Sequence, residues 1–71
     1  MSYLLWDTVS GNVVDSFTSE NEALEEVRLT VEEFGHTFAI TLALSGRDSS
    51  GRRFVVAAGQ ELIDRAISLA A

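Results

Sequence analysis

The chain contains no cysteine, and at 71 residues it is short enough for this absence to restrict how it can be stabilised. Neither a disulfide nor a thiolate zinc site is available, although these are the usual supports of a small core. A domain of this size buries only about 60% of the surface that its unfolded chain exposes. The sequence therefore predicts one domain over residues 1–71 that is stabilised by a small apolar core or by oligomerisation.

The charge of the chain restricts its partners. Eleven carboxylates oppose five basic residues, all of them arginine, and the net charge is −6. Long-range repulsion makes nucleic acid an unfavourable partner for such a chain. No apolar run approaches the roughly 18 residues of a membrane span, and no signal peptide is recognisable. We therefore expect a cytoplasmic protein without a membrane partner.

The first half of the chain has the pattern of a hairpin followed by a helix. Apolar segments at 3–6 and 13–17 flank a Ser-Gly-Asn turn, which is typical of a β-hairpin. Ser19 and Glu22 have the spacing of a capping box, in which the hydroxyl accepts a bond from the Glu22 amide. Apolar residues then recur at helical spacing until Gly35, a residue type that commonly ends helices.

Strict alternation of large and small residues predicts a strand over 37–45. Its large side chains, from Phe38 to Leu44, are expected to face the helix. The opposite face is small and almost uncharged, which predicts that a second helix or another subunit covers it. The candidate interface residues are Ala39, Thr41, Ala43 and Trp6.

A polar loop at 46–52, a strand at 53–58 and a helix from Gln60 complete the chain. Together the segments predict an α+β fold of ββα-ββα order, with about four antiparallel strands and two helices mainly on one face. The turns at 10–11 and 50–51 are both Ser-Gly and lie 40 positions apart. The two halves are therefore either a duplicated architecture or a coincidence of element lengths.

Three of the five arginines, Arg47, Arg52 and Arg53, flank the second hairpin loop. Guanidinium groups close to hydroxyls and free amides can hold a phosphate or a carboxylate. The loop matches neither a P-loop nor a nucleophile elbow, so the first interpretation is a solvated hairpin tip. Arg47, Arg52 and Arg53 remain the candidate anion-binding residues.

The reactive groups of the chain are too few for most catalytic sites. His36 is the only imidazole, and no cysteine is present. Glu32 and Glu33 precede His36 at spacings of four and three, but Gly35 interrupts the helix and a metal site needs three or more ligands. We interpret His36 as structural or solvent-facing. The sequence predicts a protein that is not an enzyme and has no catalytic residues, metal or cofactor.

The segments 17–28, 42–44 and 56–62 resemble a group of small bacterial proteins of similar length that have no assigned activity. The first of these segments is also similar to a half-domain of HicB-type antitoxins, in which a strand leads through a Thr/Ser cap into a glutamate-rich helix. The second resemblance implies a role in neutralising a toxin.

Three functions remain open at this point. The small core and the uncharged strand face favour an interaction or oligomerisation module that forms a homodimer. Alternatively, the helix over 20–33 carries six glutamates against one arginine, or −5, and suits an antitoxin-like or inhibitory partner of a basic protein. In the third, the Arg47–Arg53 loop binds phosphate, a nucleotide or RNA.

Overall fold

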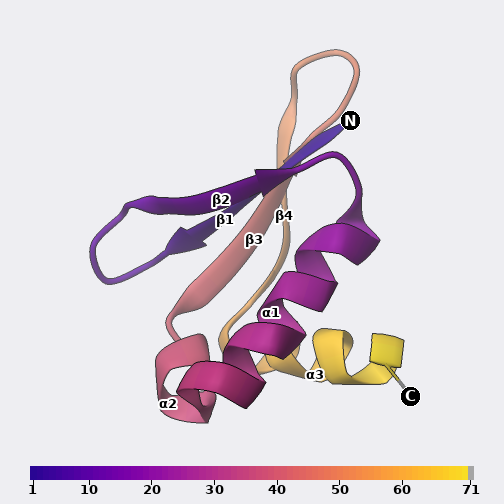
Figure 1. The fold of residues 1–71 in the computed structure, drawn as a ribbon. Helices are drawn as coiled ribbons and strands as arrows, with labels where there is room; N and C mark the ends of the chain where they lie inside the picture. Colours follow the sequence, from indigo (N-terminus) through magenta and orange to yellow (C-terminus); the bar gives the residue numbers. More distant parts are fainter. Residues whose placement is uncertain (71) are drawn as a thin grey trace.

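The computed structural model describes residues 1–70, which form one four-stranded sheet and three helices (Figure 1). This architecture confirms the predicted α+β class and ββαββα order, and it adds one short helix that was not predicted. The elements are β1 (Ser2–Asp7), β2 (Val13–Phe17), α1 (Glu20–Phe34), α2 (His36–Ala39), β3 (Leu42–Arg47), β4 (Arg53–Ala58) and α3 (Gly59–Ala70).

The strands lie in the order β2-β1-β3-β4, and all neighbours are antiparallel. The two hairpins therefore meet at β1 and β3, which pair along their whole lengths from Ser2–Arg47 to Asp7–Leu42. β2 and β4 form the edges of the sheet. Each hairpin contains one register shift. The two ββ units thus share their construction, in agreement with the similar spacing of the two halves of the sequence.

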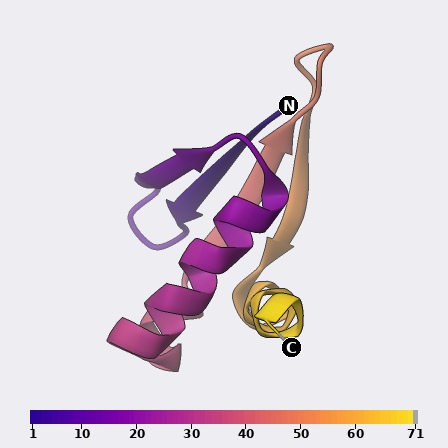
Figure 2. The same ribbon diagram turned by 45° about the vertical axis from the view of Figure 1, so that its right-hand side comes forward.

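Both long helices cover the same face of the sheet, as the two views in Figures 1 and 2 show. The core lies between this face and the helices. Its centre is the cross-strand pair of Leu5 and Leu44, both fully buried. The buried core residues are Tyr3, Leu5, Ala23, Leu24, Val27, Ala39, Leu42, Leu44, Ala57, Leu62, Ile63 and Ala66.

The N-terminal cap of α1 forms as predicted. The Glu22 amide donates to Ser19 Oγ at 3.1 Å, and the hydroxyls of Thr18 and Ser19 both donate to the Glu22 carboxylate. A cap of this kind stabilises a helix by about 1 kcal/mol. Gly35, at a φ of 91°, ends α1 in a conformation that L side chains rarely adopt.

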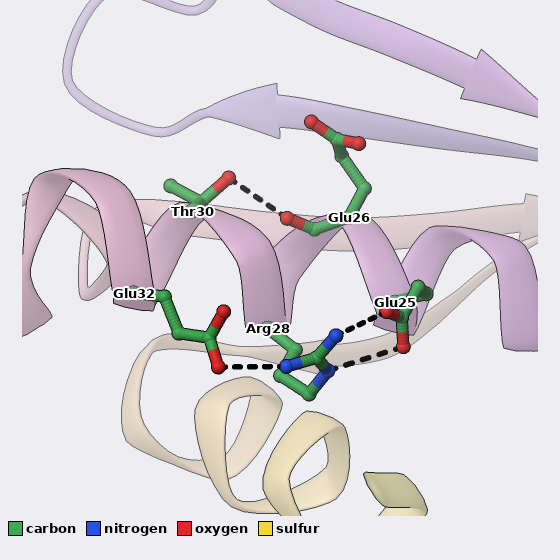
Figure 3. A network of polar contacts seen from close by, with 5 residues as sticks. All are labelled: Glu25, Glu26, Arg28, Thr30 and Glu32. Atoms are coloured by element: carbon green, nitrogen blue, oxygen red, sulfur yellow. Dashed lines mark hydrogen bonds and ion pairs between the residues drawn. The ribbon is translucent and has the colours of Figure 1, made fainter.

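Arg28 and Thr30 make polar contacts within α1 (Figure 3). Arg28 contacts both Glu25 and Glu32, the latter at 2.8 Å. Its hydrogen bond to Glu25 holds the pKa of that carboxyl below the ordinary value. The buried Thr30 hydroxyl donates to the Glu26 carbonyl at 2.9 Å. The two ion pairs of Arg28 offset part of the acidic charge that the sequence places on this helix.

The strand predicted over 37–45 is wrong in its first half. Residues 36–39 form α2, and β3 begins only at Leu42. The reason is the length of its partner, because β1 ends at Asp7, which pairs with Leu42. A strand that began at residue 37 would extend beyond β1 with unpaired backbone groups. In the observed turn the Ile40 amide donates to the His36 carbonyl instead.

Candidate functional site: the open face of the sheet

The side of the sheet away from the helices has no covering layer among residues 1–70, and we call it the open face. Because side chains alternate along a strand, the neighbours of the core residues Tyr3 and Leu5 point to this side. A groove of about 450 Å³ runs across it. The groove is lined by Leu4, Trp6, Gly11, Val13, Ser45, Arg53, Phe54 and Val55.

The groove has large apolar sides and a floor of smaller residues. Leu4 and Trp6 on β1 are half-buried, whereas Val13 and Val55 on the two edge strands are 58% and 70% exposed. Ser45 lies between them as the cross-strand partner of both Leu4 and Val55. Antiparallel sheets that face water usually carry polar residues there. This apolar outer face is therefore the candidate docking surface.

The structure brings together only two of the four predicted interface residues. Trp6 and Ala43 are cross-strand partners at the centre of the open face. Ala39, however, is fully buried in the core, so its prediction as an interface residue is wrong. Thr41 lies in the link before β3, where its carbonyl accepts a bond from the Thr8 hydroxyl at 2.8 Å. Both differences follow from the turn at α2, which removes residues 36–41 from the sheet.

Sequence reasoning did not find Leu4, Val13 or Val55 as surface residues of this face. One signal for the face was present, since residues 3–6 are apolar without alternation and must place apolar side chains on both sides of β1. Val13 reaches this face through the register of the β1–β2 hairpin, which shifts between Leu5 and Trp6, and Val55 joins it through the strand order, which places the two hairpins next to each other.

The candidate anion-binding residues divide into a pair and a separate residue. Arg47 and Arg53 are direct cross-strand partners at the end of β3 and β4, next to the open groove. Arg52 lies in the turn between the strands. Within residues 1–70, Arg28 and Arg65 have carboxylate partners within 4.0 Å, whereas Arg47, Arg52 and Arg53 have none.

Asp48 is the nearest carboxylate in sequence, but it is used by the turn itself. Its Oδ1 accepts bonds from the Ser50 amide at 2.9 Å, the Ser50 hydroxyl at 2.6 Å and the Arg52 amide at 3.0 Å. These bonds, the one from the Ser50 hydroxyl first, lower the pKa of Asp48 below its ordinary value. They shape the β3–β4 hairpin and occupy the carboxylate oxygen Oδ1, which therefore serves the turn.

The lowered pKa of Asp48 leads to a pH prediction. The ordinary pKa of an aspartate is 3.8, and the folded turn lowers it because its hydrogen bonds favour the carboxylate. The hydrogen bonds of Asp48 therefore contribute fully to stability well above pH 3.8, and this contribution is lost as the pH falls through the lower pKa of the folded state. We expect the Ser50 and Arg52 amide resonances to titrate with a midpoint below 3.8 in NMR spectra. Asp48→Asn should abolish this titration. A midpoint at or above 3.8 would contradict the hydrogen-bonded turn.

The remaining polar groups do not assemble a reactive centre. His36 contacts the Gln60 side-chain oxygen, and the Gln60 amide donates to Asp64, so this histidine links α2 to the start of α3. Among residues 1–70, no three histidine or acidic side chains lie close enough to share a metal ion. In the same part of the chain, no helix is long and apolar enough to cross a membrane.

Comparison of this chain with protein-family models, with curated proteins and with solved structures finds no match. The resemblance to HicB-type antitoxins therefore stays a prediction, and the open face and its arginine pair are the features from which a function can be argued.

Proposed function

We propose that this protein is a non-enzymatic interaction module that forms a homodimer, with two open faces packed against each other. The observation that carries this proposal is the apolar outer face of a sheet that has helices on one side only. In the dimer, the two sheets pack against each other and the helices of each copy lie outside, which gives a four-layer α/β/β/α assembly. A chain with a small core and no cysteine gains stability from such burial.

The open face carries apolar side chains that the open face of a second copy can cover. The half-buried Trp6 lies beside its cross-strand partner Ala43, and Val13 and Val55 on the edge strands are the more exposed apolar side chains. Strands spaced about 4.8 Å apart and rising about 3.4 Å per residue make a face of roughly 400 Å² in projection. Two copies would bury roughly 800 Å², which is less than the roughly 1,200–2,000 Å² of stable specific interfaces and is typical of weak, transient ones. We therefore expect a weak dimer with a micromolar dissociation constant.

Charge selects the relative orientation of the two copies. The open face has cations only at one end, where Arg47 and Arg53 lie. A twofold axis parallel to the strands would stack four guanidinium groups at the same end of the dimer. An axis across the strands places the two pairs at opposite ends, and this is the arrangement we propose because it avoids the repulsion.

The dimer is tested by two matched substitutions of exposed valines. Val55→Glu introduces a carboxylate on the open face, whereas Val9→Glu does the same in the β1–β2 turn, where Val9 is 80% exposed. Burying an unpaired carboxylate in the interface is costly, so we expect Val55→Glu to weaken the dimer at least about tenfold. Val9→Glu should leave it unchanged. Sedimentation velocity over a concentration series measures both dissociation constants, with circular dichroism to check the fold.

Two results would overturn the dimer proposal. The first is a wild-type chain that is folded and monomeric at millimolar concentration. The second is an equal loss of association in Val55→Glu and Val9→Glu, since general charge repulsion and not the open face would then explain it.

A further inference from the structure

We propose that the Arg47–Arg53 end of the open face is a binding site for the dianion of a small phosphate monoester. The two arginines lie directly opposite each other on adjacent strands, where Cβ atoms are about 5 Å apart. Like charges in this position repel each other. The chain has 11 carboxylates, yet none within residues 1–70 forms an ion pair with these two arginines. The pair is therefore suited to compensation by a ligand.

A hollow of about 270 Å³ lies beside the pair and supplies the rest of the site. Ser2 and Ser45 contribute hydroxyl groups, and Leu4 contributes apolar surface. The hollow shares Leu4, Ser45 and Arg53 with the larger groove. A small ligand can thus place its anionic group at the arginines and its apolar part over Leu4.

The charge and hydrogen-bonding groups select the ligand class. Two guanidinium groups match the charge of a phosphate monoester, whose second pKa of about 6 makes it a dianion near pH 7. Guanidinium groups bind such oxygens through paired, charge-assisted hydrogen bonds. The net charge of −6 disfavours a long polyanion such as RNA, which would have to approach the acidic parts of the chain as well.

The arginine pair lies at the end of the open face, although the hollow beside it shares Leu4, Ser45 and Arg53 with the groove of the proposed dimer. In the register of β1 with β3, Arg47 pairs with Ser2 and Ala43 pairs with Trp6, four positions further along the strand. At about 3.4 Å per residue, the arginine end lies roughly 14 Å from Trp6. Binding is measured on the wild-type chain at protein concentrations below and above the dimer dissociation constant, so that a failure of dimerisation and a failure of anion binding can be told apart.

Calorimetric and NMR titrations with phenyl phosphate at pH 7.5 test the site in the intact chain. We expect saturable binding that perturbs the amides of Ser45 and Arg53, and a loss of at least about tenfold in affinity in both Arg47→Gln and Arg53→Gln. Arg52→Gln is the matched control, because it removes the same charge from the neighbouring turn. It should change the affinity less than about twofold.

Three results would overturn the proposed phosphate site. An equal loss in Arg52→Gln would show diffuse attraction to the arginine-rich end instead of a site at the pair. Absence of saturation would exclude a site altogether. Binding of the dicarboxylate malonate as tight as that of phenyl phosphate, measured in parallel, would overturn the assignment to phosphate monoesters.

Discussion

Replacing Leu44 by alanine is expected to reduce the free energy of unfolding by about 3 kcal/mol. Leu44 is fully buried in the central strand β3, between Leu5 on β1 and Ala57 on β4, and its side chain reaches the helices. Both sides of the core lose contacts when it is truncated, and a short sheet between two hairpins has little freedom to close the cavity. Domains of this size have total stabilities of about 4–10 kcal/mol, so this loss is a large fraction.

Urea denaturation followed by circular dichroism measures the effect, at one fixed protein concentration because dimerisation contributes to apparent stability. Leu29→Ala is the control, since Leu29 is 41% exposed on α1. It should cost less than about 1 kcal/mol. Similar losses for the two variants would contradict the assignment of Leu44 to the centre of the core.

Replacing Gly46 by valine is expected to destabilise the domain by about 2 kcal/mol. Gly46 lies beneath the ring of Phe54, its cross-strand partner, and a Cβ atom built at Gly46 would lie 2.7 Å from Phe54 Cε2. The ring also makes an edge-to-face contact with Tyr3 at a centroid distance of 6.3 Å. Valine at position 46 must therefore push the ring from its place over β3 and away from Tyr3.

A double-mutant cycle separates this clash from other effects of the substitution. In a Phe54→Ala background the space above Gly46 is free, and valine has a higher strand propensity than glycine. Gly46→Val should then be neutral or stabilising, which gives a coupling of more than about 1 kcal/mol between the two positions. Denaturation curves of the four proteins provide the cycle. Additive losses would show that the ring does not rest on Gly46.

The predictable parts of this fold are those that depend on residues close together in sequence. Ser19 and Glu22 define the start of α1, and Gly35 defines its end, because capping and left-handed backbone are local properties. Segment 37–41 was predicted as strand because its alternation of large and small residues is compatible with one. The length of β1 prevents a strand at these residues. β1 lies more than 30 positions away in the sequence, and its last residue, Asp7, determines where β3 can begin.

In the candidate sites, too, the sequence predicted what depends on neighbouring residues and missed what depends on strand pairing. The sequence placed the arginines around one hairpin, but only the register of β3 with β4 shows that Arg47 and Arg53 form a pair and that Arg52 stands apart. Of the predicted interface residues, Trp6 and Ala43 met on one face, whereas Ala39 turned into the core.

By itself the sequence determined the α+β class, the order of the elements, the helix caps and the acidic charge, because these follow from composition and from neighbours within a few positions. The tertiary structure alone decided the strand order, the position of the α2 turn and the residues of the open face. These depend on pairing between β1 and β3, whose partners are separated by 35 to 45 positions. Local propensity carries no information about which distant strand supplies the missing hydrogen bonds.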